Sequence, residues 1–486
     1  MDWIPDSRHD VYVIVHFLIQ VGIALRVVMQ RRPIGESLAW IMVVFAIPVG
    51  GPILYLLIGE LRLGRKRGRR YAELTKPVKE WLSAMPGRSP FEWPRLAEEF
   101  QPVSQLFERT IGLPSIPCNQ AELLSPWSRV LECLLADIDA AKSSCHLEFY
   151  IWSVGGEADK VAEALIRARE RGVECRVVVD AVGSRRFLRS EVAKRLRSAG
   201  VLLCAALPGG IIRMLFVRFD LRMHRKIVVI DGRIGYTGSL NMVDPRYFKR
   251  GEGYGQWVDA MVRLEGPAVE AMQITFLGDW YEETDATLED VQHEADAVPQ
   301  PQRGDCPVQV MPSGPDLPPG SVELVLLTAV YSARRELVIT TPYFMPNESL
   351  AQALVAAVRR GVKVIVVIPK KVDSMLVRYA SGTVKGQLLE AGVRIAQFGG
   401  GLLHTKSVTV DGAYSLFGSV NLDPRSLRLN FEILLALYDA EFTGRLRALQ
   451  QEYIDKSTLM NVEAYRRRPR WQQSAESFAR LLAPLL

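Results

Sequence analysis

Two stretches of the chain decide its fold: MHRKIVVIDGRIGYTGSLN at residues 223–241 and LHTKSVTVDGAYSLFGSVN at residues 403–421. Both carry His, Lys, Asp, Gly, Ser and Asn in the same order and with the same spacing, and one copy stands in each half of the chain. A single histidine before an apolar run is usually structural. A match at six positions in two copies instead indicates an internal repeat with a shared chemical role.

The repeat extends beyond this motif. Residues 145–179 begin CHLEFYIW and end RARERGVECRVVV, and residues 336–368 begin ELVITTPYF and end AAVRRGVKVIVVI. Strand-like and helix-like segments alternate in both stretches, as is typical of α/β units. The sequence therefore predicts an α/β fold of two similar halves, residues 105–300 and 301–460. A polar, proline-containing linker at about 284–305 is expected between them.

Local patterning places the motif residues in two half-sites. A β-branched run follows each histidine, which predicts that the histidine lies on a strand. Residues two apart on a strand share a face, so the histidine and lysine should point the same way, as should the serine and asparagine. The predicted half-sites are His224, Lys226, Ser239 and Asn241 in the first copy and His404, Lys406, Ser419 and Asn421 in the second.

Four carboxylates accompany the half-sites. Asp231 and Asp411 belong to the repeated motif, but each precedes a glycine and stands an odd number of residues from its histidine. We expect them to brace a turn rather than to transfer protons. Asp259 and Glu432 follow on later strands and are candidates for accepting the second imidazole N–H, which would fix the tautomer. The sequence leaves open whether each serves the histidine of its own half or of the other.

Two such half-sites facing each other suit a phosphodiester. Lysines, amides and hydroxyls supply donors for binding the phosphate. One neutral imidazole can attack phosphorus, while the other, protonated, donates to the leaving alkoxide and later deprotonates an incoming alcohol. Neither a metal nor another cofactor is expected, because the HExxH, P-loop and dinucleotide-binding patterns are absent from the sequence.

Two apolar segments predict a transmembrane helical hairpin over residues 1–60. Residues 37–59 are apolar and long enough to span a bilayer, which takes about 20 residues, and they are the stronger candidate. Residues 11–25 either span the bilayer, lie at its interface or form a re-entrant segment. A basic run, LRLGRKRGRR at 61–70, follows directly. By the positive-inside rule it places the rest of the chain in the cytoplasm, as a multi-pass membrane protein.

Charge and cysteine content narrow the function further. The formal net charge is +6, but ten basic residues are concentrated at 61–70 and 466–470. The remaining chain is mildly acidic, which argues against nucleic acid and favours an anionic membrane surface as partner. Residues 61–104 are expected to form a basic juxtamembrane linker and 461–486 a basic, amphipathic tail. The six cysteines show no C-x-x-C spacing and are expected to be reduced.

The doubled pattern HxKx4Dx6GSxN resembles the signature of the phospholipase D superfamily. The resemblance implies two phospholipase D-type α-β-α-β-α halves forming one bilobed catalytic body. It also implies that substrate phosphorylates His224, the nucleophile, and that His404 acts as acid and base. The catalytic set carried over is His224, Lys226, Asp231, His404, Lys406 and Asp411, with Ser239, Asn241, Ser419 and Asn421 binding phosphate.

Further segments resemble bacterial cardiolipin synthases within that superfamily. They are RRPxGxxxAW at 31–40, SGPD at 313–316, TPYFMP at 341–346 and GSVNLDPRS at 418–426. The resemblance spans nearly the whole chain and implies that two phosphatidylglycerol molecules become cardiolipin and glycerol at a bacterial inner membrane. A hydrolytic phospholipase D or a phosphatidylserine synthase remains open, because acceptor choice lies outside the motifs. The anchor disfavours a nuclease, and two intact motifs disfavour an inactive scaffold.

The first half contains extra residues shortly before its histidine, within LPGGIIRMLFVRFDLRM at 207–223. Large apolar residues and arginines alternate there, as in elements that lie at a membrane interface. We expect residues 210–219 to form a membrane-dipping lip. The alternative is an additional core element between the lobes. The sequence does not indicate an oligomeric state.

Overall fold

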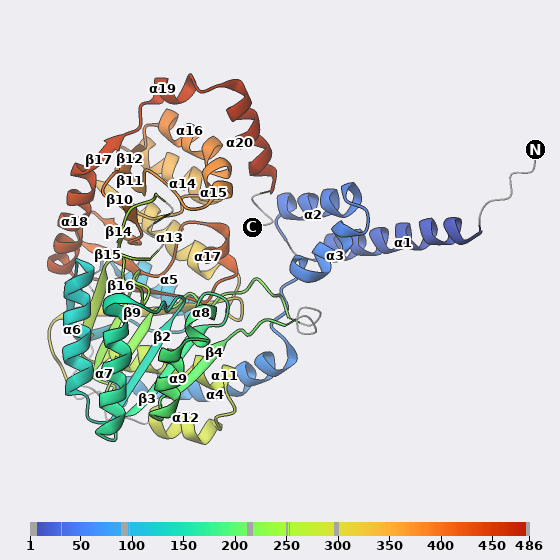
Figure 1. Cartoon of the computed structure of the whole chain (residues 1–486). Coiled ribbons are helices and arrows are strands. Elements are labelled where there is room, and N and C mark those ends of the chain that lie inside the picture. The colour runs from blue at the N-terminus through green and yellow to red at the C-terminus, as the bar shows by residue number, and fades with distance from the viewer. Residues whose placement is uncertain are drawn as a thin grey trace, which may run out of the picture.

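The computed structural model describes residues 7–30, 32–88, 96, 98–210, 217–248, 251, 253–295 and 301–482. Figure 1 shows a large α/β body from which the helices α1 to α3 project. Of the expected lip, residues 211–216 lie outside the described residues.

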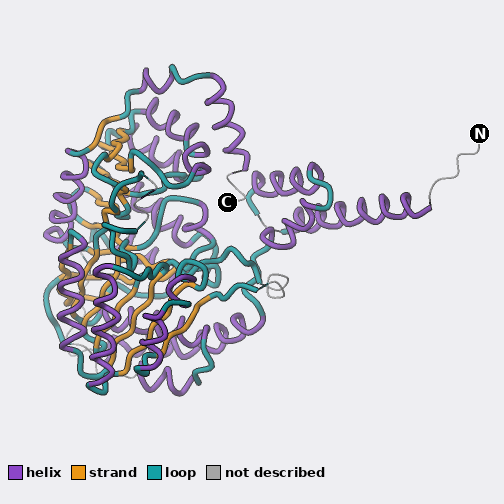
Figure 2. Tube along the Cα trace, in the orientation of Figure 1, coloured by secondary structure: helices purple, strands orange, loops and turns teal. Residues whose placement is uncertain are grey.

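One sheet of 15 strands runs through both halves of the body, as the orange segments of Figure 2 show. From the centre outward, the first half contributes β1 (Ile116–Leu124), β8 (Met261–Glu265), β6 (Ile234–Gly238), β5 (Ile227–Ile230), β2 (Ser144–Phe149), β3 (Glu174–Asp180) and β4 (Leu202–Ala206). The second contributes β9 (Cys306–Ser313), β16 (Glu432–Leu437), β15 (Tyr414–Gly418), β14 (Ser407–Val410), β10 (Glu336–Thr340), β11 (Lys363–Pro369), β12 (Arg394–Phe398) and β17 (Ser457–Leu459).

The strand order confirms the predicted duplication. The antiparallel pair β1–β9 stands at the centre, and the order outward from it is equivalent on both sides, with β17 as an additional edge strand. In each half three parallel strands lie toward the edge, β2–β3–β4 and β10–β11–β12. The middle strand of each set, β3 (ECRVVVD) and β11 (KVIVVIP), is rich in valine and isoleucine, as expected where helices cover both faces of a sheet.

Alternation along the strands explains the helical layers. In β5, Val228 and Ile230 join the core beneath α6 (Trp127–Ala140) and α7 (Asp159–Glu170). Ile227 and Val229 join the core on the opposite face, around α11 (Ala268–Glu283). Because successive side chains point to opposite faces, one short strand supports both layers.

The remaining helices cover the two faces and the ends of the sheet. Those from the first part of the chain are α4 (Arg65–Arg88), α5 (Gln101–Ile111), the 3-10 turn η2 (Gly156–Ala158), α8 (Arg185–Leu188), α9 (Glu191–Ser198) and α12 (Leu288–Ala295). Those of the second half are α13 (Ser321–Ser332), α14 (Glu348–Arg359), α15 (Met375–Ala380), α16 (Gly382–Ala391), α17 (Pro424–Arg428), α18 (Ala440–Asp455), α19 (Val462–Arg466) and α20 (Arg470–Leu482). Helix α12 occupies part of the stretch that we expected to be only a linker.

The N-terminal segment differs from the expected pair of spans. Helix α1 (Ser7–Met29) contains the segment Asp10–Met29. Among the described residues, this is the one helical segment that is long and apolar enough to cross a membrane. The second segment, expected to be the stronger span, is divided into α2 (Ile34–Ala46), α3 (Gly50–Leu54) and a π-helical turn, η1 (Tyr55–Gly59). Ile47 is extended before Pro48, because proline disfavours a helical residue ahead of it.

The basic run at 61–70 is only partly available to a membrane. Arg67 is buried and pairs with Glu282 at 2.6 Å and with Glu283. Lys66 Nζ lies 2.8 Å from Asp285 Oδ1. Helix α4 therefore docks on α11 through its basic side chains, which the sequence analysis assigned to lipid.

The C-terminal tail is folded onto the second half. Helix α20 packs against α15 and α16, and Arg468 pairs with Glu476 at 2.7 Å. Trp471 and Phe478 on α20 remain 66% and 63% exposed. The tail is thus helical and amphipathic, but its basic residues are partly engaged by the body.

Candidate active site

The two histidines lie where the halves meet. His224 and His404 stand three residues before β5 and β14, in extended segments rather than on the strands themselves. His224 N–H donates to the carbonyl of Phe431 at 2.9 Å, and His404 N–H donates to that of Val258 at 2.9 Å. Each histidine backbone is therefore held by the opposite half.

Two short parallel pairings between the halves produce this crossed arrangement. Strand β13 (Leu402–Leu403), just before His404, pairs with β7 (Trp257–Val258) of the first half. A bridge between Met223 and Phe431 is its counterpart on the other side. Both pairings bring a histidine of one half beside a carboxylate of the other.

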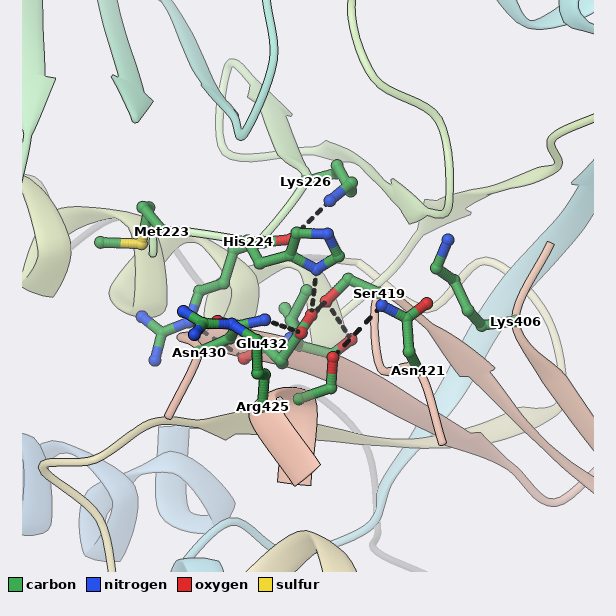
Figure 3. A network of polar contacts seen from close by, with 12 residues as sticks. Met223, His224, Lys226, Lys406, Ser419, Asn421, Arg425, Asn430 and Glu432 are labelled. Atoms are coloured by element: carbon green, nitrogen blue, oxygen red, sulfur yellow. Dashed lines mark hydrogen bonds and ion pairs between the residues drawn. The ribbon is translucent and has the colours of Figure 1, made fainter. Parts of the chain in front are cut away.

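The carboxylates also cross between halves, which answers the question that the sequence left open. His224 Nδ1 lies 2.8 Å from Glu432 Oε2, and His404 Nδ1 lies 2.7 Å from Asp259 Oδ1. Figure 3 shows the first of these contacts. A carboxylate accepts from Nδ1–H, so each pair fixes the tautomer and directs Nε2 away from the carboxylate.

The two motif serines brace these carboxylates. Ser419 Oγ donates to Glu432 Oε2 at 2.6 Å, and Ser239 Oγ donates to Asp259 Oδ1 at 2.6 Å. A hydroxyl has one proton to donate, and both serines are fully buried. In this structure the serines therefore position the carboxylates, where the sequence analysis expected them to donate to phosphate.

Lysines and amides provide the donors of the site. Lys226 Nζ donates to the carbonyl of its own motif histidine at 2.7 Å, and Lys406 does the same at 2.5 Å. An ammonium has three protons, so both retain donors for an anion. Asn241 Nδ2 is buried without a partner among the described residues. The amide of Asn421 donates to Ser426 Oγ at 3.3 Å (Figure 3).

Asp231 and Asp411 are not brought to the histidines. Both adopt positive φ, 53° and 55°, in the turns after β5 and β14, and each precedes a glycine. Asp231 accepts from the backbone N–H groups of residues 142–144 at 2.7 to 3.1 Å. Asp411 accepts equivalently from residues 334–336. These contacts brace the turns against the loops that precede β2 and β10. Asp231 and Asp411, which the resemblance placed in the catalytic set, therefore have a structural role.

Burial and charge set the protonation of the site. Burial lowers the pKa of His224 to about 4, against the opposing effect of Glu432. Burial, with repulsion from Lys406, lowers the pKa of His404 to about 4. Burial also lowers the pKa of Lys226 to about 8 and that of Lys406 well below its ordinary value. At pH 7 the free site therefore combines neutral imidazoles with at least one ammonium.

Sequence patterns missed two aromatic neighbours of the histidines. The ring of Tyr150 lies 4.9 Å from that of His224, and the ring of Trp257 lies 4.4 Å from that of His404. Tyr150 directly follows β2 and Trp257 begins β7, so neither belongs to the repeated motif. The available signals were the place of Tyr150 in the repeated stretch CHLEFYIW and the nearness of Trp257 to Asp259 in sequence.

Comparisons with known proteins agree with this geometry. The family model described as "Cardiolipin synthase, PLD-like domain" matches residues 134–272 and 326–453, and the model described as "Phospholipase_D-nuclease N-terminal" matches residues 18–60. Cardiolipin synthase A of Serratia proteamaculans is 42% identical over 471 residues, 97% of each chain. Cardiolipin synthase A of Yersinia pseudotuberculosis is equally similar. The crystal structure of Haemophilus influenzae phosphatidylserine synthase shares the fold at TM-score 0.59, with 14% identity over 79% of this chain and 99% of that one.

Proposed function

The chain belongs to the cardiolipin synthase family of phospholipase D-like proteins, and from this premise we propose that it joins two phosphatidylglycerol molecules into cardiolipin, releasing glycerol. The observation that carries the proposal is the crossed pair of histidine–carboxylate contacts, 2.8 Å and 2.7 Å long, beside two buried lysines. Such a site can stabilise a phosphodiester anion and transfer protons on both sides of it.

In the first step, His224 is the nucleophile. Its Nδ1–H is held by Glu432, so the free Nε2 attacks the phosphorus of the first lipid. A nitrogen–phosphorus bond forms, the bond to the glycerol headgroup breaks, and glycerol leaves with a proton from His404. The product of this step is a phosphatidyl adduct on His224.

In the second step, a hydroxyl of another phosphatidylglycerol attacks the adduct. His404 accepts the proton of that hydroxyl while the nitrogen–phosphorus bond breaks, which restores His224 and releases cardiolipin. One phosphodiester bond is broken and one is formed, so the exchange requires no external energy source.

His404 needs a proton for the first step, although its pKa of about 4 leaves it neutral in the free site. Binding of the lipid phosphate raises this pKa, so that His404 can carry the proton. Negative charge beside Lys226 and Lys406 offsets the repulsion that these ammoniums exert on a protonated His404, and thereby raises its pKa.

The N-terminal helices anchor this reaction at a membrane. Helix α1 has the length and apolar surface to cross a bilayer, and exposed apolar side chains continue along α2. The lipid substrates are then presented to the body from the membrane surface. We further propose that the body lies on the cytoplasmic side of a bacterial inner membrane, which the arginines after residue 60 favour under the positive-inside rule.

Purified protein in phosphatidylglycerol vesicles tests the function. Cardiolipin and glycerol in equal amounts are the expected products, and His224→Ala should abolish both together with the adduct. Phosphatidic acid as the main product would instead identify a hydrolase. Cardiolipin formation by the His224→Ala variant would refute the assigned nucleophile.

A further inference from the structure

The backbone of Phe431 joins the nucleophile to its carboxylate. The carbonyl of Phe431 accepts from the N–H of His224 at 2.9 Å, and its own N–H donates to the carbonyl of Arg222 at 3.0 Å. The next residue in the chain is Glu432, which holds His224 Nδ1 (Figure 3). The position of the Phe431 backbone therefore determines how the imidazole and the carboxylate meet.

Two buried guanidinium groups lie over the ring of Phe431. The Cζ atom of Arg67 is 4.1 Å from the ring centroid, and that of Arg225 is 5.6 Å from it. The three side chains belong to buried residues, so water does little to weaken the attraction between cation and ring face. A β-carbon at Gly314 would lie 2.7 Å from Phe431 Cδ1, so a glycine there leaves room for the ring. These neighbours together confine the phenyl group.

Arg225 is itself fixed by three groups. It follows His224 in the chain, and its Nε donates to the backbone carbonyl of Glu432 at 3.0 Å. Its Nη2 donates to the carbonyl of Ser313 at 3.1 Å, and its Nη1 pairs with Asp279. The guanidinium therefore supports the ring and also holds the backbone of the carboxylate residue directly.

Arg67 brings the juxtamembrane segment into this arrangement. It lies on α4, the first long helix after the N-terminal helices, and its pairs with Glu282 at 2.6 Å and with Glu283 attach it to α11. Slightly earlier in the chain, the carbonyl of Arg62 accepts from the N–H of Arg218 at 2.9 Å, in the extra segment that leads to the first histidine. The chain after the N-terminal helices thus supports the surroundings of the nucleophile at two points.

The equivalent positions beside His404 carry no charge. Val258 takes the place of Phe431 there, because its carbonyl accepts from the N–H of His404. Thr405 corresponds to Arg225 in the repeat, and its hydroxyl donates to the same Val258 carbonyl at 3.2 Å. The two half-sites share their motif, but the stacked arginines belong to the side of the nucleophile.

We propose that Phe431 is a positioning residue for the nucleophile and that Arg67 and Arg225 hold it in place. The stacked ring fixes the Phe431 backbone, which keeps the imidazole Nδ1–H of His224 on Glu432 and leaves Nε2 directed at the phosphate. The juxtamembrane helix α4 then supports the active site in addition to connecting the body to the membrane. The inference rests on the proposed function for the role of His224 as nucleophile.

The test compares two variants of the stack, Phe431→Leu and Arg67→Lys, with matched controls in the full-length protein. Leucine removes the ring face, while lysine keeps the charge that pairs with the carboxylates of α11 but cannot stack. Phe442→Leu is the control for the first variant, because Phe442 is 1% exposed in the same apolar core. Arg69→Lys is the control for the second, because the Arg69 side chain is 83% exposed on the same helix.

Rapid quenching in phosphatidylglycerol vesicles gives the rate of adduct formation and its dependence on lipid concentration. Both stack variants should form the adduct roughly tenfold more slowly at saturating lipid, with a KM near that of wild type, because the nucleophile is misaligned while lipid binding is unchanged. Both controls should stay within about threefold of wild type. Equal rates in Phe431→Leu and Phe442→Leu, or a change in KM alone, would overturn the positioning role.

The tautomer of His224 in the resting protein provides a readout that does not depend on the reaction. In ¹⁵N NMR, wild-type His224 should show one tautomer, protonated at Nδ1, whereas Phe431→Leu and Arg67→Lys should show both tautomers for His224 and leave His404 unchanged. A change in both histidines, or in neither, would indicate a merely structural role and overturn the proposal. Failure of the wild type to make any cardiolipin would refute the proposed function, and the tautomer of His224 would still decide the role of Phe431.

Discussion

Replacing Glu432 with glutamine removes a buried charge from the second half, and we expect it to impair the histidine of the first half. Glu432 is fully buried, and its Oε2 accepts from both His224 Nδ1 and Ser419 Oγ. Glutamine has nearly the same shape, and its amide oxygen can accept the bonds from His224 and Ser419. The substitution therefore tests charge rather than packing.

The magnitude follows from the contact distance. With 2.8 Å between Nδ1 and Oε2, the charge centres of an imidazolium and a carboxylate lie about 4 Å apart. Their attraction is then about 4 kcal/mol at an effective dielectric constant of 20. His224 becomes positively charged as it bonds to phosphorus, so this attraction stabilises the first transition state. We expect adduct formation to slow by up to about 10³-fold.

Rapid quenching with excess phosphatidylglycerol measures adduct formation, and ¹⁵N NMR of the histidines shows which imidazole is perturbed. The resonances of His224 should move in the Glu432→Gln variant, while those of His404 stay close to wild type. Glu441→Gln is a suitable control, because that side chain is 81% exposed in the same half. Perturbation of His404 in place of His224, or an adduct rate within about threefold of wild type, would refute the crossed assignment.

Three further outcomes are expected. The acid limb of kcat/KM should lie near pH 4, because protonation of His224 below its pKa of about 4 removes the nucleophile, and an acid limb near pH 6.5 would contradict this. Above about pH 8 the activity should fall further, because Lys226, with a pKa of about 8, loses the charge that binds phosphate. Arg67→Met should lower the free energy of unfolding by about 3–5 kcal/mol in thermal denaturation, since it leaves buried carboxylates unpaired, whereas Arg69→Met, on an 83% exposed side chain, should cost at most about 1 kcal/mol. In a fragment of residues 61–486, which lacks the α1 anchor, Phe478→Ser should weaken sedimentation with anionic vesicles without changing the melting temperature, and unchanged sedimentation would show that α20 does not contact the membrane.

The repeat made the fold predictable, because the residue patterns typical of strands and helices could be recognised in both copies. Runs such as IVVI at 227–230 are apolar on both faces, and the structure places helices on both sides of them. The same short-range reasoning identified a turn at Asp231, where a glycine follows. These features depend on residues close together in the chain.

The details that sequence reasoning missed depend on long-range contacts. The serines two residues before each motif asparagine could be read as phosphate donors, because nothing local shows that a carboxylate from a later strand accepts their protons. Arg67 was assigned to lipid because its partners lie more than 200 residues away. The apolar run at 37–59 has the composition of a span, yet Pro48 ends its first helix. The prediction relied on the length and apolar composition of the run and did not take into account that a proline interrupts the helix.

The crossed contacts make the two halves chemically interdependent. Each histidine takes its backbone partner and its carboxylate from the opposite half, although the motif that contains it is continuous within its own half. A half taken alone would leave its histidine without a fixed tautomer and its carboxylate without the imidazole N–H that it accepts. The central pair β1–β9 and the small pairings at β7–β13 and Met223–Phe431 therefore complete the site as well as the sheet. Because the pairing is reciprocal, the two imidazoles begin in nearly equivalent surroundings, and the distinction between nucleophile and acid must come from what lies beside each half. Asn430 donates to Glu432, which holds His224, whereas Asp259 holds His404 beside the ring of Trp257, so the surroundings of the two histidines differ in detail.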